Sequence, residues 1–323
     1  MTIVAGELKF YKSATNNDSG NNGGRISTTE IVTNTANNLF PNATQAERTA
    51  GVTRYRKEFL RNKNASDLTY SSSKVWIGDR SDADDYFQIH AGTDTDTQTD
   101  WEGYTNWYGA GLLNTSVASG ETELIVDYDT ASGVFSGEGL QVYVNDGSNT
   151  ATVGVVGTPT WLGSTATFSI SGELGANFSA TTTTVSTILS LGDVAASTNS
   201  WTETSSSGTY NESTYPVITY NVGTATDSFT LTFSDASNFN CTGAVTGSLG
   251  SGDISTDFQP ANGSSYYFKV NKNGWGGTWA AGETVTFNTV HSGKAIVLKQ
   301  VVPAGTSSYS NSVVELSLTG ESA

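Results

Sequence analysis

Short apolar-rich runs separated by Asn, Asp and Gly recur along the chain from Val52 onward. Runs at Lys74–Ile77, Tyr86–Ile89, Glu123–Tyr128 and Ser228–Ser234 follow this pattern. Alternation with a period of two places successive side chains on opposite faces of a strand. Turn signals about every 8–12 residues are typical of β-sandwiches. The sequence therefore predicts an all-β fold, built from several antiparallel β-sandwich-like units.

Short helices are expected only near the N-terminus. Ser27-Thr-Thr-Glu30 and Thr44-Gln-Ala-Glu47 both have the spacing of a capping box, in which a hydroxyl and a carboxylate satisfy free amides at a helix start. Pro41 and Gly51 bracket the second box and limit its helix to about two turns. The polar and aromatic stretch from Thr93 to Tyr108 is expected to be a long surface loop.

Charge is distributed unevenly along the 323 residues. Residues 1–80 hold eleven Lys and Arg against seven Asp and Glu, whereas the rest hold four against twenty-four. Because phosphate recognition needs clustered Lys and Arg, the acidic body disfavours nucleic acid and anionic membranes as partners.

The single Cys241 excludes an intrachain disulfide. The N-terminus shows no secretory signal, so folding in a cytoplasm is expected.

Residues 1–90 supply too few strands to close a seven-strand sandwich. The runs Ala295–Val302 and Val313–Leu318 read as two further strands. We expect them to complete a discontinuous N-terminal domain of residues 1–111 plus 292–323. Residues 112–192 and 193–291 then form two inserted β domains.

The residues needed for catalysis are sparse. A Gly-x-Ser-x-Gly elbow is absent from the sequence, as are phosphate and dinucleotide loops. The two histidines are His90 and His291, and adjacent side chains on a strand point to opposite faces, so His291 and Ser292 would not pair. The interpretation is a protein that is not an enzyme and has no cofactor.

One metal site is weakly indicated. Asp94, Asp96 and Asp100 alternate with hydroxyl and amide residues, as oxygen ligands do in calcium loops. The loop lacks Gly at the sixth position and has Thr105 in place of the twelfth-position Glu, so a solvated loop is the competing interpretation to Ca²⁺. Trp101 and Trp107 in the same loop suit either a core or a sugar platform.

An assembly surface is the second candidate site. Six of the fifteen Lys and Arg lie between Gly23 and Asn62, and planar Arg side chains suit oriented contacts with an acidic neighbour. Pairing of these basic residues with the acidic body of the same chain is the alternative. Aromatic side chains in a Gly-rich turn add two further anchors. The predicted interface residues are Arg25, Arg48, Arg54, Arg56, Lys57, Arg61, Trp275 and Trp279.

The segment Gly23–Asn62 (GGRIS…TRYRKEFLRN) resembles virion structural proteins encoded by tailed bacteriophages. The C-terminal stretches WGGTWAAGETVTF, KQVVPAGTSSYSN and LSLTGES resemble the end of the same family. The resemblance covers both ends of the chain and, in the middle, only the Gly- and Thr-rich style. It implies a non-enzymatic component of the neck, tail or baseplate, and it carries over no catalytic residue.

A multi-copy subunit that docks through its basic N-terminal region is therefore expected. Its partners would be copies of itself, as a homo-oligomer in a symmetric assembly, and other virion proteins. Its location would be the virion, assembled in the host bacterial cytoplasm. Residues 1–62 would lie in subunit contacts and residues 112–291 would project outward. Two alternatives stay open: a capsid decoration protein and a carbohydrate-binding adhesin that uses the Trp101–Tyr108 stretch.

Overall fold

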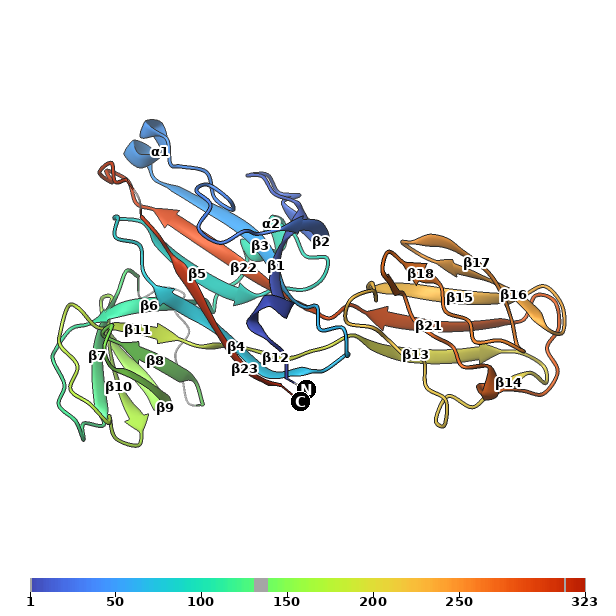
Figure 1. Cartoon of the computed structure of the whole chain (residues 1–323). Coiled ribbons are helices and arrows are strands. Elements are labelled where there is room, and N and C mark those ends of the chain that lie inside the picture. The colour runs from blue at the N-terminus through green and yellow to red at the C-terminus, as the bar shows by residue number, and fades with distance from the viewer. Residues whose placement is uncertain (1, 131–138, 311, 323) are drawn as a thin grey trace.

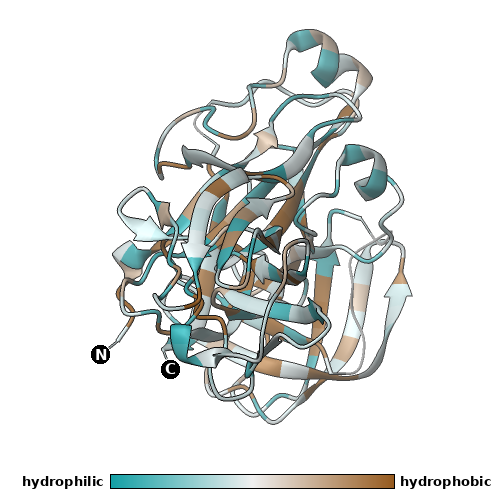
Figure 2. Ribbon diagram, turned by 90° about the vertical axis from the view of Figure 1, so that its right-hand side faces the viewer, coloured by the Kyte–Doolittle hydropathy of each residue, from teal (hydrophilic) through white to brown (hydrophobic). Residues whose placement is uncertain are grey.

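The computed structural model describes residues 2–130, 139–310 and 312–322. The fold is all-β, as predicted, and consists of several antiparallel sheets with short helices (Figure 1). In Figure 2, hydrophobic residues recur at intervals along the strands, as expected for strands that bury one face. Within the described residues, no helix has the length and apolar character needed to cross a membrane.

A two-layer sandwich forms the centre of the molecule. One layer contains β2-β1-β3-β22-β5, and the other contains β12-β4-β23. Leu60, Val75 and Ile296 lie between the layers and are fully buried. The strands are β1 (Leu8–Thr15), β2 (Gly23–Glu30), β3 (Val52–Asn62), β4 (Tyr70–Asp79), β5 (Tyr86–Ala91), β12 (Leu189–Val194), β22 (Gly293–Val302) and β23 (Glu315–Ser322).

A closed sheet of six strands continues from the edge of β5. β6 pairs with β5, β7 and β11, so the order β6-β7-β10-β9-β8-β11 returns to β6. Leu124, Val144 and Phe168 fill its interior. The strands are β6 (Tyr108–Leu113), β7 (Glu123–Tyr128), β8 (Gln141–Asn145), β9 (Thr150–Leu162), β10 (Thr165–Ser171) and β11 (Thr184–Thr187).

A five-stranded sheet of order β13-β21-β15-β16-β17 extends away from the rest of the molecule (Figure 1). Its core is rich in aromatic residues, including Phe229, Phe268 and Phe287. The strands are β13 (Ser197–Thr204), β15 (Asp227–Phe233), β16 (Asn238–Gly243), β17 (Gly247–Asp253) and β21 (Thr284–Val290), with the short pairs β14 (Thr209–Tyr210) and β20 (Trp275–Gly276), and β18 (Ala261–Asn262) and β19 (Ser265–Tyr266).

The Thr44 capping box is confirmed, and the Ser27 box is wrong. Thr44 caps α1 (Gln45–Ala50), and its Oγ1 accepts a hydrogen bond from the Glu47 amide at 3.3 Å. Ser27–Glu30 instead lies in β2, where Ile26 and Glu30 pair with β1. Pairing to a neighbouring strand satisfies the backbone of this Thr-rich segment, so the local helix signal does not prevail.

The expected loop at 93–108 is present, and about half of its residues are exposed, but it also holds a short helix and two buried indoles. The segment contains α2 (Gln98–Trp101) and covers the outer face of the large sheet. Trp101 and Trp107 are buried. The division into domains 1–111 plus 292–323, 112–192 and 193–291 stays a prediction, although β22 pairs with β3 and β5, and β23 with β4.

Candidate functional site

A buried charged pair lies where the 93–107 segment covers β3. Alternation along β3 directs Lys57 toward this segment and Glu58 and Leu60 toward the central sandwich. Lys57 Nζ lies 2.6 Å from Asp96 Oδ1, and the two side chains are 0% and 6% exposed. Nζ also donates to the carbonyl oxygens of Asp96 at 2.9 Å and Thr93 at 3.0 Å. All three acceptors of the ammonium group therefore come from one turn of the chain.

Aromatic rings enclose this pair. Lys57 Nζ lies 5.2 Å from the ring centre of Phe59 and 5.8 Å from that of Trp101. Such faces attract a cation and exclude water. Tyr104 Oη donates to Asp96 Oδ2 at 3.1 Å, and the Thr93 amide donates to the same oxygen at 3.0 Å. Each carboxylate oxygen of Asp96 therefore has a separate set of donors.

The electrostatics follow from this enclosure. Burial lowers the pKa of Lys57, and the bond to Asp96 opposes that effect. Burial alone would raise the pKa of Asp96, but the hydrogen bonds from Lys57 and Thr93 bring it below its ordinary value. Burial and the neighbouring Asp96 raise the pKa of Tyr104 to about 12, so its phenol keeps the proton that it donates.

The predicted calcium ligands do not converge. Asp94 contacts His291 and Arg25, Asp96 contacts Lys57, and Asp100 Oδ2 accepts from the Thr97 amide at 2.8 Å. In the described ranges, no group of three or more His, Cys, Asp or Glu side chains could hold a metal ion. Calcium binding at this loop stays a prediction, and these contacts give it no support.

A second polar network joins the five-stranded sheet to the central sandwich. Asn62 Nδ2 donates to Val194 O at 3.0 Å. Ser292 Oγ lies 2.7 Å from both Asn62 O and Asn221 O. Asn221 Nδ2 donates to Leu68 O at 2.9 Å. Asn62, Asn221 and Ser292 are all buried, so these bonds satisfy groups that water does not reach. We call these three residues the joint.

Charged side chains support the joint from the side. Arg25 Nη1 donates to Thr226 O at 2.9 Å and contacts Asp94 Oδ2 at 3.2 Å. Asp94 Oδ1 lies 2.8 Å from His291 Nε2. Burial opposes the charge on Asp94, but the bond with His291 and the nearby Arg25 outweigh burial and lower its pKa. Arg61 Nη2 donates to Val222 O at 3.0 Å. The five-stranded sheet is therefore held by side chains from β2, β3 and the 93–107 segment.

The other predicted basic residues hold the segment before β3. Arg54 donates to Pro41 O at 2.9 Å and to Glu47 at 2.6 Å. Arg56 donates to Leu39 O at 3.0 Å and to Asp18 at 2.7 Å. Arg48 donates to Ala43 O at 2.8 Å. Arg54 and Arg56 therefore form ion pairs within the chain, but with Glu47 and Asp18 of the N-terminal region instead of the acidic body, and Arg48 bonds a backbone carbonyl.

Trp279 lies inside the five-stranded unit rather than on a surface. Its ring stacks on Phe233 at 4.2 Å between centroids with planes 5° apart. The backbone of Gly208 also lies against the Trp279 ring, since a Cβ there would be 2.3 Å from it. Trp275 is partly buried against Phe233 and Tyr210. The interface role of the eight predicted residues stays a prediction. Arg54, Arg56, Lys57 and Trp279 are buried in the folded chain, so a partner could contact only the other four.

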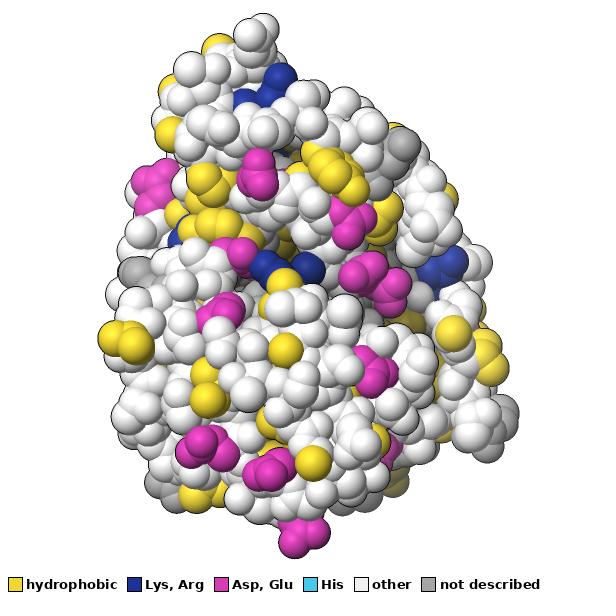
Figure 3. Space-filling view, turned by 90° about the vertical axis from the view of Figure 1, so that its left-hand side faces the viewer, with side chains coloured by type: hydrophobic (Ala, Val, Ile, Leu, Met, Phe, Trp, Pro, Cys, Tyr) yellow, Lys and Arg dark blue, Asp and Glu magenta, His cyan; other side chains and the backbone are white. Residues whose placement is uncertain are grey.

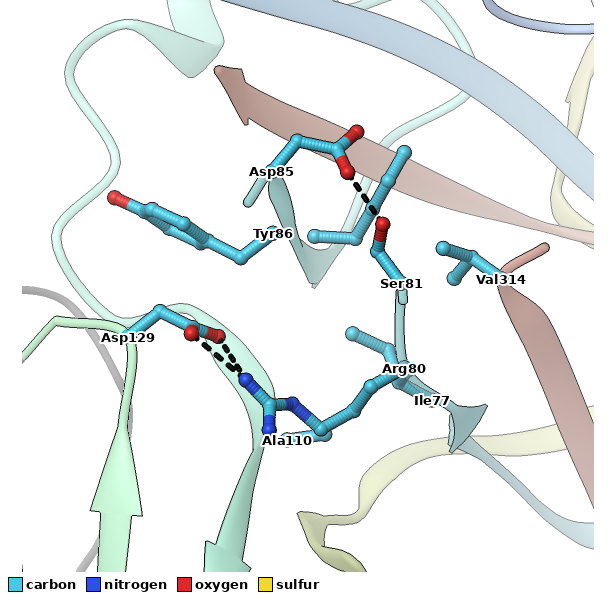
Figure 4. Close-up of a pocket in the computed structure, with 9 residues that line it drawn as sticks. Ile77, Arg80, Ser81, Asp85, Tyr86, Ala110, Asp129 and Val314 are labelled. Atoms are coloured by element: carbon cyan, nitrogen blue, oxygen red, sulfur yellow. Dashed lines mark hydrogen bonds and ion pairs between the residues drawn. The ribbon is translucent and has the colours of Figure 1, made fainter. Parts of the chain in front are cut away.

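A small pocket lies between the central sandwich and the closed sheet (Figure 4). Arg80 Nη2 contacts both oxygens of Asp129 at 2.7 and 2.9 Å, and Ser81 donates to Asp85. The cavity volume is ≈ 10 Å³, about the space of one water molecule.

On the face drawn in Figure 3, Asp and Glu side chains are scattered, with Lys and Arg at a few points.

Sequence reasoning missed the joint and the Lys57–Asp96 pair. Thr97-Gln-Thr-Asp100 has capping-box spacing with Asp at the fourth position, a signal that could have located α2. Nothing local marks Asn62, Asn221 and Ser292, because they are far apart in sequence and meet only in the folded chain.

No protein-family model matches the chain, and it has no match among curated proteins. Among solved structures it aligns with VP17, a capsid protein of bacteriophage P23-77, at 9% identity over 79% of this chain and 89% of that chain, with a TM-score of 0.18. The VP16-VP17 complex of the same phage aligns at 9% identity over 78% and 89%, with a TM-score of 0.17. Vicilin from tomato aligns at 6% identity over 97% and 87%, with a TM-score of 0.13. Likeness at such TM-scores carries no argument about fold or function.

Proposed function

We propose that this chain is a non-enzymatic structural subunit of a tailed-phage particle, present in several copies in the neck, tail or baseplate. The observation that supports this function best is the joint. Asn62, Asn221 and Ser292 fix an extended five-stranded unit to the central sandwich through buried hydrogen bonds. A subunit that transmits position or force within an assembly needs parts that do not reorient freely. The resemblance of both chain ends to virion structural proteins points to the same function.

Docking through the N-terminal region is part of this proposal, in a revised form. Arg48, Arg54 and Arg56 hold residues 39–47 against the sheet, so they act as internal supports. The contact surface would then be the exposed side of the segment they hold. Val32, in the stretch that leads from β2 to this segment, is 59% exposed. A single exposed apolar side chain is ordinary on a protein surface, so Val32 serves as a position at which to test the proposed contact.

The adhesin alternative loses the two indoles of its sugar platform and keeps only Tyr104 and Tyr108, which are partly exposed. Trp101 and Trp107 are buried against Val297, between the 93–107 segment and the outer face of the large sheet. A ring stacked on a sugar needs an exposed face, and neither indole offers one here. The proposal therefore keeps the structural function, with other virion proteins and copies of this chain as partners.

Mass photometry of the purified chain tests self-assembly. We expect a discrete oligomer that Val32→Asp disrupts, because a charge would then have to be desolvated in the contact. Val245→Asp is the matched control, since Val245 is 56% exposed but lies in the turn between β16 and β17. Equal loss of the oligomer in both variants would contradict docking through the N-terminal region.

Antibody labelling of purified tailed-phage particles tests the position. We expect label at the neck, tail or baseplate, with a fixed copy number by quantitative mass spectrometry. Label on heads that lack tails would favour the capsid decoration protein instead. Absence of the chain from purified particles would refute the virion function.

A further inference from the structure

We propose that Lys57 and Asp96 condense to form an amide cross-link between β3 and the 93–107 segment. Lys57 Nζ lies 2.6 Å from Asp96 Oδ1, so the amine nitrogen is held beside the carboxyl group that it would attack. Well-oriented intramolecular pairs reach effective concentrations on the order of 10⁵–10⁸ M.

The two carboxylate oxygens of Asp96 have different surroundings, and this difference determines which one leaves as water and which one stays in the amide. Oδ1 receives its hydrogen bond from Lys57 Nζ. Oδ2 accepts from the Thr93 amide at 3.0 Å and from Tyr104 Oη at 3.1 Å. Oδ1 is therefore positioned to take protons from nitrogen and leave, while Oδ2 is held as the future amide oxygen.

The reaction balances without any other reactant. The Lys57 ammonium gives one proton to Oδ1, and the neutral amine attacks Cγ of Asp96 to form the new C–N bond. A second proton then moves from nitrogen to Oδ1, the C–Oδ1 bond breaks, and water leaves. The ammonium and carboxylate thus become one amide and one water molecule, with no change in oxidation state.

Negative charge develops on Oδ2 during attack at Cγ. The Thr93 N–H and the Tyr104 O–H already point at this oxygen, which is the arrangement of an oxyanion hole. Tyr104 is a positioning group that also stabilises this charge. Its phenol packs on His90, with 4.3 Å between ring centres, so it is not free to turn away.

The enclosure favours the product. Trp101 and Phe59 flank Lys57, and the Lys57 and Asp96 side chains are 0% and 6% exposed, so the released water leaves an almost dry site. The cross-link would replace two buried charges, which are costly to desolvate, by a neutral amide. Its position would tie β3 covalently to the segment that also holds Asp94 beside the joint.

Intact mass spectrometry of the denatured full-length protein tests the proposal. We expect the wild-type mass to fall short of the sequence mass by one water molecule. Protease digestion should yield one linked pair of peptides that contain Lys57 and Asp96. A wild-type chain with the full sequence mass, both freshly purified and after prolonged incubation at neutral pH, would overturn the proposal and leave an ordinary ion pair.

Variants locate the bond. Lys57→Met and Asp96→Ala should restore the full mass expected for each variant. Lys299→Met is the matched control, because Lys299 also packs on an indole, that of Trp107 at 5.1 Å, and it should keep the deficit of one water. Tyr104→Phe should slow cross-linking by about 10²-fold, the effect of removing one oxyanion donor. A Tyr104→Phe rate equal to wild type would refute the assigned role of Tyr104, and a mass deficit that persists in Lys57→Met would refute the assigned bond. If Lys57→Met does not fold, the linked peptides of the wild-type chain decide the question alone.

Discussion

Replacing Glu58 with Gln should stabilise the protein at alkaline pH. Glu58 lies on the face of β3 that packs into the central sandwich, is 4% exposed, and its Oε1 has no hydrogen-bond partner. Burial raises the pKa of Glu58 from its ordinary 4.5 to about 8. At pH values between these two, Glu58 therefore keeps its proton in the folded protein, whereas in the unfolded chain it has lost it.

The sign and size of the effect follow from linkage. Since the folded state binds one more proton at Glu58 in this window, the contribution of Glu58 to the free energy of unfolding is greatest below pH 4.5 and is lost as pH rises through about 8. A shift of one pKa unit corresponds to about 1.4 kcal/mol. The loss of stability that Glu58 can cause is therefore at most on the order of 5 kcal/mol. Glu58→Gln removes the titration and keeps the shape, so the variant should match wild type below pH 4.5 and exceed it above pH 8.

Urea unfolding at a series of pH values measures this gap. Hydrogen exchange of peptides from β3 shows which unfolding transition includes the central sandwich. Glu47→Gln is a control of opposite sign, because hydrogen bonds from Thr44 and Arg54 lower the pKa of Glu47 to about 2. Its contribution is present above pH 4.5 and lost as pH falls through about 2. Parallel loss of stability in wild type and Glu58→Gln across the window would refute the argument from burial.

Four further predictions concern the joint, the core, the metal and the domains. Ser292→Ala removes the shared donor to two buried carbonyls and should cost about 1–3 kcal/mol, seen as faster hydrogen exchange around Asn221. Gly208→Ala places a methyl group against Trp279 and should cost about 1–3 kcal/mol, with a changed near-ultraviolet circular dichroism signal. Chelation should leave the Tm unchanged, because Asp94 and Asp96 are bonded to side chains of the chain; a lowered Tm would restore the calcium prediction. Limited proteolysis should protect residues 193–291 as a fragment, whereas release of a stable 1–111 fragment would contradict the discontinuous domain.

The fold class was predictable because strand periodicity and turn residues are local signals. Glu123–Tyr128 was located to the residue, and the short helix after Thr44 follows from its capping box. Ser27–Glu30 failed because its capping box is also local, while its pairing with β1 is not. Where two local signals compete, contacts between distant segments decide.

The environment of the charged residues was not predictable. Lys57 lies in an alternating strand like its neighbours, and only the covering segment with Trp101 and Asp96 makes it a buried ion. Sequence reasoning named pairing within the chain as one option for Arg54 and Arg56 but could not find their acceptors. Those acceptors include the backbone carbonyls of residues 17, 39 and 41, which carry no side-chain signal.

The joint has a consequence for how such a chain can evolve. Asn62 bonds the chain at Val194, just before the five-stranded unit, and at Ser292, just after it. Residues 195–291 thus leave and rejoin the rest of the chain beside one residue, Asn62, which contacts Val194 through its side chain and Ser292 through its backbone carbonyl. Any other module whose two ends lie equally close could be exchanged at this point without disturbing the register of β3 and β22. Recombination could in this way vary the projecting unit while the rest of the molecule keeps its sequence.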